Sequence, residues 1–353
     1  MGLVNLDPLG VVGLVALGLI GGILGGFVGG GGAFVMVPGL MSLGGEGLCS
    51  VGSNLLHRLG RMATSDRRRS ALRRVDLKLL AVLALPSLAG VEAGRVASSL
   101  LRLRFGRVAA DLYISVVVII VLGAVTRMLV LDLMRSRRRP APARSLSVKG
   151  VMQRLRPLHV PPVIRFPASN VVVSLWLVLG IGFVAGWFGG TIALGGFLTV
   201  PALIYLLGAP ASTAIATDLS LVLVVGIYGA VSFAARGYVD LRATMLLYLG
   251  SIVGFHLGML GTRLVREGPI RVVTCIVLGL VVLSRLVALP LTCAAGGWLP
   301  LAAGARTALS VCSLAALFGG GALLVAMVVG AVGRAIWART GFGAGDDMNG
   351  EED

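Results

Sequence analysis

Long apolar runs, interrupted by glycine-rich or basic stretches, follow one another along almost the whole chain. A hydrocarbon core about 30 Å thick requires roughly 20 apolar residues per helix, so each long run predicts a membrane segment. The runs 30–43 and 192–208 are short for complete spans and are expected to be half-helices or re-entrant, which gives about eight to eleven segments. The expected segments lie near 9–29, 30–43, 46–60, 79–99, 108–134, 170–190, 192–208, 211–235, 243–262, 272–292 and 306–333.

Composition supports a helical membrane protein and argues against a soluble one. Of the 353 residues, 57% are hydrophobic and 13% are charged, whereas a soluble domain is about 45–50% apolar and about 25% charged. The 52 glycines lie inside apolar runs without a G-X-Y period, which excludes collagen and disordered linkers. We therefore expect an all-α polytopic membrane protein embedded in a lipid bilayer.

Basic residues outnumber acidic ones by 31 to 15, which gives a net charge of +16. In a membrane protein such an excess collects in cytoplasmic loops, so we expect no nucleic-acid partner. Residues 58–78 and 135–165 hold the two largest basic clusters and are predicted to face the cytoplasm. The smaller basic cluster at 100–107 then lies outside, against the same rule.

The two halves of the chain repeat one sequence pattern. Residues 31–40 (GGAFVMVPGL) match 194–203 (LGGFLTVPAL) at an offset of 163, and 51–55 (VGSNL) match 215–219 (IATDL) at an offset of 164. An ordered series in near-constant register indicates a duplicated unit. With five segments per unit the second copy inserts with opposite orientation, so the repeats are expected to be inverted. The offset of 164 also relates 75–77 (VDL) and 239–241 (VDL).

The stretch 135–169 combines prolines, arginines and a loss of apolar periodicity, which marks a solvated linker. The predicted organisation is a first transmembrane repeat (1–134), a basic cytoplasmic linker (135–169), a second transmembrane repeat (170–340) and an acidic, disordered tail (341–353).

Each half contains a glycine-rich break followed by a proline. Glycine frees the backbone from helical geometry, and broken backbone survives in lipid only where protein buries it or where it lines a cavity. The helix after each break would present free N–H groups and a positive dipole end, which together favour an anion. The candidate anion-binding residues in the breaks are Gly30, Gly31, Gly32, Pro38, Gly189, Gly190, Gly195, Gly196 and Pro201.

A purely structural role is the alternative for these glycines, because small residues let membrane helices approach closely. Repetition at equivalent positions favours binding for the two breaks. Gly90 and Gly94, with their equivalents Gly254 and Gly258, have no adjacent proline, so there we favour close packing.

Asp218 lies inside an apolar segment, where an Asp costs roughly 2.5–3.5 kcal/mol on insertion scales and is expected to face a cavity or a partner. Its repeat equivalent is Asn54, and Thr217 pairs in the same way with Ser53. We take all four as candidate substrate-binding residues. The alternative for Asp218 is a helix cap.

Glu92 and His256 occupy equivalent positions in the next matched helix and are candidates for proton coupling, although an intramembrane histidine is often a satisfied core residue. Arg95, Arg127 and Arg285 would attract an anion, but we expect these long side chains to extend to the membrane interface.

These motifs resemble the sulfite exporter TauE/SafE family of membrane transporters. The resemblance is strongest in 186–220 and 237–265, and the first half shows the same order more loosely in 25–44, followed by 51–56 (VGSNLL) and 74–79 (RVDLKL). It implies a plasma-membrane permease for small anions, often sulfur oxyanions or organosulfonates. The chain departs from the family pattern at Ser53-Asn54, where the family often has Thr-Ser, and in its long basic linker.

No G-x-x-x-x-G-K-[ST], HExxH or GxSxG motif occurs, and the four cysteines and three histidines are scattered, so we expect no enzyme, cofactor or metal site. Pattern and resemblance together favour a secondary active transporter of a small anion such as sulfite or sulfoacetate. Protons are the expected driving ion, with Asp218 as the best titrating group, because burial favours the neutral form of a carboxyl group. The alternatives are an anion channel, or a membrane-embedded enzyme or scaffold without transport.

The basic loops generate a test of topology. In a background without native cysteines, Ser65→Cys and Ser145→Cys should be shielded from an impermeant thiol reagent added to intact cells. Gly237→Cys should react from outside. Strong external labelling at position 145 would reverse the predicted orientation.

Overall fold

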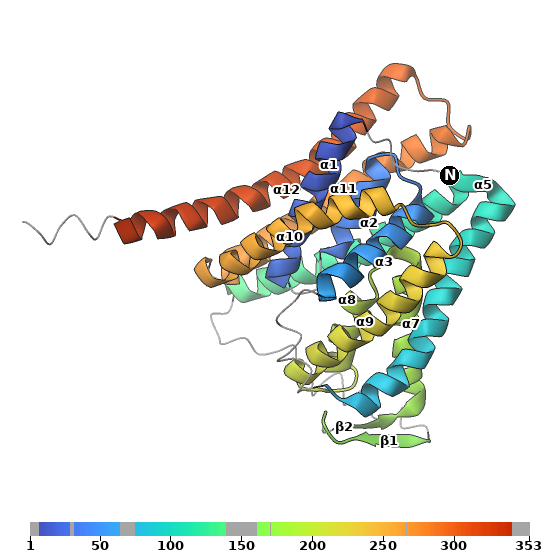
Figure 1. The fold of residues 1–353 in the computed structure, drawn as a ribbon, viewed down its shortest axis with the longest axis vertical. Helices are drawn as coiled ribbons and strands as arrows, with labels where there is room; N and C mark the ends of the chain where they lie inside the picture. The colour runs from blue at the N-terminus through green and yellow to red at the C-terminus, as the bar shows by residue number, and fades with distance from the viewer. Residues whose placement is uncertain are drawn as a thin grey trace, which may run out of the picture.

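The computed structural model describes residues 7–28, 32–63, 75–138, 161–169, 171–265 and 267–340, and this part of the chain forms a helical bundle with one β-hairpin (Figure 1). The elements are α1 (Pro8–Val28), α2 (Ala33–Ser42), α3 (Gly47–Ala63), α5 (Leu77–Arg138), β1 (Val163–Phe166), β2 (Val171–Ser174), α7 (Leu175–Ile192), α8 (Gly195–Tyr205), α9 (Ala211–Ala234), α10 (Leu241–Leu264), α11 (Glu267–Ala295) and α12 (Ala303–Thr340).

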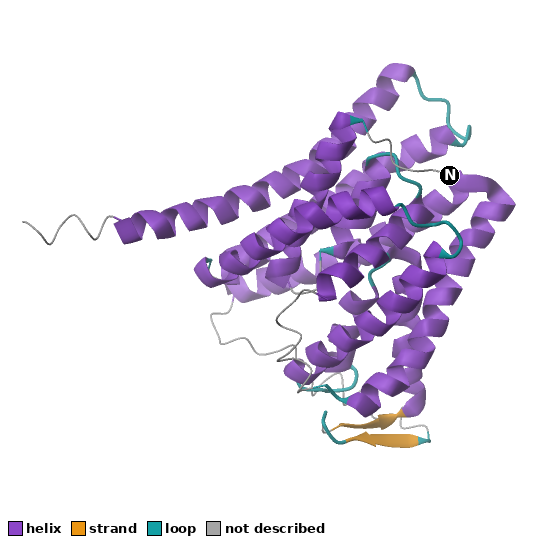
Figure 2. Cartoon of the chain, in the orientation of Figure 1, coloured by secondary structure: helices purple, strands orange, loops and turns teal. Residues whose placement is uncertain are grey.

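The expected fold class, an all-α polytopic membrane protein, is confirmed. Within the described residues, seven helices are long and apolar enough to cross a membrane. Figure 2 shows how completely helix dominates the bundle. The structure also describes part of the segments predicted at 30–43 and 192–208 as the short helices α2 and α8.

The antiparallel pair of β1 and β2 was not expected, because the sequence there was assigned to a solvated linker and to the start of a helix near 170. Val163 pairs with Ser174 and Phe166 with Val171. The side chain of Phe166 is fully buried in a cluster with residues from α5, α7, α8 and α9. The hairpin therefore packs against one end of the bundle (Figure 1), and α7 begins only at Leu175.

Helix α5 is two helices joined at a sharp turn. A straight helix of 62 residues would extend for about 93 Å, about three times the thickness of a hydrocarbon core. Gly106 interrupts the helix with φ 84° and ψ 177°, a backbone conformation that residues other than glycine rarely adopt. The two parts correspond to the segments predicted at 79–99 and 108–134, and Figure 1 shows the chain turning back between them.

The short helices α2 and α8 span about 15 and 17 Å at 1.5 Å per residue, which is half of a hydrocarbon core. Helix α2 returns along α1, because a Cβ added to Gly39 would lie 2.3 Å from Leu17 Cδ1, and one added to Gly13 would lie 3.0 Å from Leu43 Cδ2. Gly32, with φ 59°, lies against Gly21 where the chain reverses. The start of α8 is likewise close to α7, since a Cβ on Gly195 would be 2.6 Å from the carbonyl oxygen of Ala185.

Glycine allows two helix pairs to pack backbone against backbone, α1 with α10 and α7 with α5. A Cβ on Gly26 would lie 2.7 Å from Gly258 Cα, and one on Gly190 would lie 2.1 Å from the carbonyl oxygen of Val91. Gly26 and Gly190 are separated by 164 residues, the offset of the sequence repeat. In both pairs the first long helix of one half therefore contacts the opposite half, at equivalent positions. The remaining glycines at these two contacts are Gly18, Gly22, Gly182, Gly186, Gly90, Gly94, Gly250 and Gly254.

Candidate functional site

Two hydroxyl groups join the halves through equivalent hydrogen bonds. The Ser53 hydroxyl accepts a hydrogen bond from the backbone N–H of Asp240 at 2.9 Å, and the Thr217 hydroxyl accepts one from the backbone N–H of Asp76 at 3.2 Å. Both Asp76 and Asp240 cap the helix that follows, accepting from the backbone three residues later at 3.1 Å. Ser53 and Thr217 were predicted to bind substrate, but the structure places them in these contacts between halves rather than at a cavity wall.

The next residues along the chain, Asn54 and Asp218, lie at the starts of the two short helices. The Asn54 amide donates to the carbonyl oxygen of Ala33, the first residue of α2, at 3.3 Å. A Cβ on Gly196 in the first turn of α8 would lie 3.1 Å from Asp218 Oδ2 and 3.3 Å from Oδ1. Asp218 is 8% exposed, and its Oδ1 atom has no hydrogen-bond partner in the described structure. The sequence repeat is therefore matched by equivalent positions in space.

Arg58 brings a buried positive charge to the same place. Its side chain is 6% exposed, and Nη1 donates to the carbonyl oxygen of Ala193 at 2.6 Å. Ala193 connects α7 to α8 in the left-handed conformation, with φ 56°. The Nε atom of Arg58 has no hydrogen-bond partner among the described residues, and Asp218 acts on the guanidinium as the opposite charge.

The assignment of Arg58 to a cytoplasmic loop at 58–78 was wrong, because α3 continues to Ala63 and carries this side chain into the protein. The sequence repeat indicated that position 58 lies within a helix, since the offset of 164 aligns Arg58 with Val222, in the middle of a predicted apolar segment. Sequence reasoning also missed Ser87 and Thr199, which line the same cavity.

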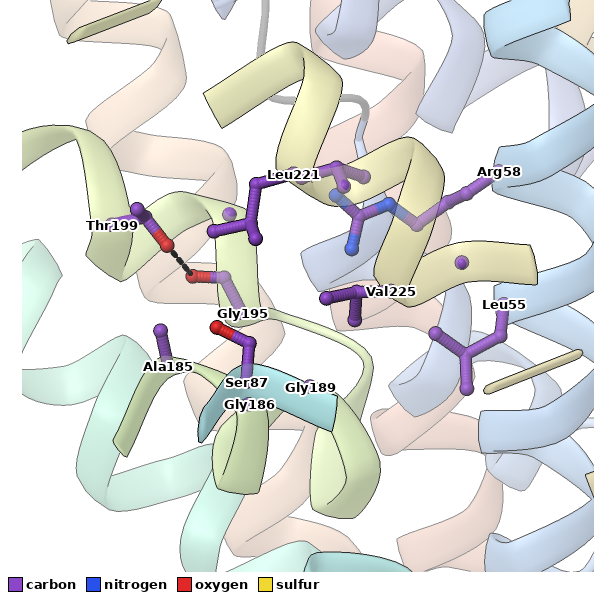
Figure 3. A pocket seen from close by; sticks show the side chains of 13 residues that line it. Leu55, Arg58, Ser87, Ala185, Gly186, Gly189, Gly195, Thr199, Leu221 and Val225 are labelled. Carbon is purple, nitrogen blue, oxygen red and sulfur yellow. Dashed lines mark hydrogen bonds between the residues drawn. The ribbon is translucent and has the colours of Figure 1, made fainter. Parts of the chain in front are cut away.

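A small cavity lies beside Arg58 and the first turn of α8 (Figure 3). The space open to the centre of a water-sized sphere is about 20 Å³, which suffices for about one water molecule. The Arg58 side chain extends from α3 toward Leu221 and Val225, and the Thr199 hydroxyl donates to the carbonyl oxygen of Gly195 at 3.1 Å (Figure 3). The cavity is lined by Leu55, Arg58, Ser87, Ala185, Gly186, Gly189, Gly195, Gly196, Thr199, Leu221, Val222, Val225 and Gly226.

Of the other residues predicted from the breaks, Gly30 and Gly31 lie outside the described residues. Gly189, Gly195 and Gly196 line the cavity, whereas Gly190 packs against α5. The remaining three lie elsewhere: Gly32 at the start of α2, Pro38 buried within α2, and Pro201 exposed on α8.

The two other proton-coupling candidates do not line this cavity. Glu92 on α5 pairs with Arg95 and with Arg236 (Nη2–Oε1 3.4 Å), and it accepts a hydrogen bond from Ser232 at 2.8 Å. His256 is exposed on α10, with Nδ1 2.8 Å from the carbonyl oxygen of Ile252. Within the described chain, no group of three His, Cys, Asp or Glu side chains is placed to hold a metal ion.

The expectation that the membrane arginines extend to an interface was wrong for two of the three. Arg95 is 4% exposed and Arg285 is 3% exposed. Arg95 is compensated by the adjacent Glu92, and Arg285 contacts Ser42. Only Arg127 of the three is exposed.

The profile of the sulfite exporter TauE/SafE family matches residues 14–286, which include both glycine breaks, both short helices and the residues that line the cavity. The chain belongs to this family. It is therefore a multi-pass membrane transporter, and the family agrees with the expectation of a plasma-membrane protein that is not an enzyme. Comparisons with curated proteins and with solved structures return no match.

Two glycine substitutions separate the roles of cavity and packing. In Gly196→Leu the new Cβ meets side-chain ends, Val222 Cγ2 at 2.7 Å and Asp218 Oδ2 at 3.1 Å, whereas in Gly258→Leu it meets backbone, the Ile23 carbonyl oxygen at 2.4 Å. Gly196→Leu should abolish transport with a modest loss of folded protein, and Gly258→Leu should reduce the yield of folded protein. Size-exclusion yield and anion flux per folded molecule measure the two effects. An equal loss of yield with transport per molecule preserved in Gly196→Leu would contradict a binding role for this break.

Proposed function

We propose that this protein is a proton-coupled secondary transporter of a small sulfur oxyanion or organosulfonate, such as sulfite or sulfoacetate. The observation that carries the proposal is the buried Arg58 guanidinium, which donates to Ala193 just before α8, together with the buried Asp218, which lies against the first turn of α8 and acts on Arg58 as the opposite charge. Family membership supports transport, and the charges supply the selectivity for an anion and the means of coupling.

Anion binding in this proposal uses two positive groups. Arg58 offers a guanidinium whose Nε has no hydrogen-bond partner among the described residues, and guanidinium groups bind oxyanions through charge-assisted hydrogen bonds. The N-terminus of α8 adds backbone N–H groups and the positive end of a helix dipole. Because both groups recognise charge and shape, sulfite and a sulfonate head group fit equally well.

Proton coupling follows from the position of Asp218. Its carboxylate oxygens face the first turn of α8, where the proposed substrate anion also binds. An ionised Asp218 therefore repels the anion and competes with it for Arg58, whereas a protonated Asp218 does neither. Anion and proton then bind together. Asn54, the equivalent residue at the start of α2, is always neutral, so only one of the two breaks carries this coupling.

The small volume of the cavity favours a carrier over a channel. A space for about one water molecule cannot hold a sulfur oxyanion with its neighbours unmoved, so each transport cycle has to open the site. The reciprocal bonds of Ser53 and Thr217 tie each of α3 and α9 to the opposite half next to this site. Counterflow of labelled substrate in proteoliposomes would support a carrier, and current far above carrier rates would support the channel alternative.

Arg58→Gln tests anion recognition. Loss of a charge-assisted hydrogen bond costs about 1.5–3 kcal/mol, so the half-saturating substrate concentration should rise about 10- to 150-fold. Arg58→Lys, which retains the charge, should be affected less. Initial rates of labelled sulfite and sulfoacetate counterflow measure the effect, and the exposed Arg104→Gln is the matched control. Unchanged saturation in a folded Arg58→Gln protein would contradict the proposed site.

Asp218→Asn tests proton coupling. The substitution places at position 218 the residue that the other half has at the equivalent position, Asn54. The variant should keep the fold and counterflow, but it should lose the anion accumulation that an imposed pH difference drives. The measurement is labelled-anion uptake into proteoliposomes with and without that difference, and the exposed Asp132→Asn on α5 is the control. Full pH-driven accumulation in Asp218→Asn would exclude Asp218 as the coupling residue and leave it as a structural group.

A further inference from the structure

We infer that the protein has a second oxyanion-binding site, in an open pocket around Arg285. The pocket has a volume of about 440 Å³ and is lined by the end of α2, the region after the α5 turn, α11 and α12. Its lining includes Gly44 and Arg107, which directly follows the break of α5 at Gly106. Figure 1 shows the turn of α5 at the end of the bundle opposite the β-hairpin. None of its lining residues belongs to the cavity at Arg58.

Arg285 is the arginine of this pocket that has no ion-pair partner among the described residues. Its side chain is 3% exposed, and one guanidinium nitrogen, Nη2, donates to the Ser42 hydroxyl. Among the described residues its Nε atom has no hydrogen-bond partner, and no carboxylate lies within 4.0 Å to form an ion pair. A buried guanidinium without a bound opposite charge is unfavourable, so a site at an open pocket favours an anion from outside the chain.

Asp111 acts on the Arg285 guanidinium as an opposite charge, but among the described residues it forms no ion pair with it, because its two oxygens are engaged elsewhere. Oδ1 accepts a hydrogen bond from the backbone N–H of Gly47 at 2.7 Å, and Oδ2 is 3.5 Å from Nε of Arg107. The pocket lining thus holds two guanidinium groups and one carboxylate, which leaves one positive charge. Arg285 is the more buried of its two arginines and the one without an ion pair in the described chain.

The wall beside Arg285 is rigidly held. The Ser284 hydroxyl donates to the carbonyl oxygen of Ser313 at 2.8 Å, and the Ser313 hydroxyl donates to the carbonyl oxygen of Ser284 at 3.1 Å. These two bonds fix α11 against α12 next to the guanidinium. The geometry suits a tetrahedral or pyramidal oxyanion of sulfur or phosphorus, held by Arg285 and the hydroxyl of Ser42. Its source is either a free anion or the phosphate of a lipid head group.

Protection of an introduced cysteine tests this site without requiring transport. Thr292 lines the pocket, so Thr292→Cys is made in the full-length chain with Cys49, Cys275, Cys293 and Cys312 replaced by alanine. The protein is placed in phosphatidylcholine nanodiscs and labelled with a neutral maleimide. Sodium sulfate should slow labelling compared with sodium gluconate of equal ionic strength. Adding Arg285→Leu should raise the half-protecting sulfate concentration by about 10-fold or more.

Three controls keep the test decisive. Arg104→Gln removes an exposed charge from α5 and should leave protection unchanged. Ala288→Trp fills the pocket while keeping Arg285, so it should reduce protection even if Arg285→Leu folds poorly. If phosphatidylglycerol slows labelling without sulfate in the protein that retains Arg285, and not in the Arg285→Leu protein, the source of the anion is a lipid head group.

Equal sulfate protection in the Arg285→Leu protein, or no protection by sulfate or phosphatidylglycerol with Arg285 present, would overturn the inference. Because the readout does not depend on Arg58, Asp218 or turnover, failure here is separate from failure of the proposed transport function.

Discussion

The hydrogen bond from Arg58 to the carbonyl oxygen of Ala193 is the interaction on which the candidate site depends. In a membrane protein, a break in helical backbone has to find its hydrogen-bond partners inside the protein. At the break between α7 and α8 that partner is a guanidinium, which brings a full positive charge next to the positive end of α8. A buried cation needs an opposite charge nearby, and Asp218 supplies it. In the proposed mechanism, a substrate anion competes with the Asp218 carboxylate for this guanidinium.

The two halves of the chain pack by equivalent contacts, but this arrangement of charges occurs at only one of the two breaks. The helix pairs α1 with α10 and α7 with α5 use glycines at equivalent positions, and Ser53 and Thr217 make equivalent bonds to the opposite half. The charges do not follow this symmetry, because the equivalents of Asp218 and Arg58 are Asn54 and Val222. Packing is therefore shared between the halves, whereas the charge is concentrated at α8. A single charged site fits one bound anion per cycle.

Features that depend on local sequence could be predicted, including the apolar helices, the short segments after each break and Asp218 as a polar residue in an apolar run. The repeat also predicted which residues correspond. Features set by distant contacts could not be predicted, because Ser53 and Thr217 find their partners 187 and 141 residues away. Arg58 was assigned to a loop because four further arginines follow it within 11 residues of sequence, and composition gives no sign of where α3 ends. The burial of Arg95 and Arg285 could not be predicted either. Arg95 is buried beside Glu92, and Arg285 lies where α11 meets α2 and α12.

The difference in size between the two arginine sites places them at different steps of a transport cycle. The cavity at Arg58 has room for about one water molecule, so an anion enters it only when α3 and α9 move relative to the opposite half. The pocket at Arg285 holds about 440 Å³ without any such movement. An anion can therefore reach Arg285 while the central cavity is still too small for one. Helix α2 connects the Arg285 pocket to α3, since Ser42 at its end contacts Arg285 and Ala33 at its start accepts a hydrogen bond from Asn54 of α3. In the proposed mechanism, occupancy of the Arg285 pocket raises the local anion concentration beside α2, which contacts a helix that has to move when the central site opens.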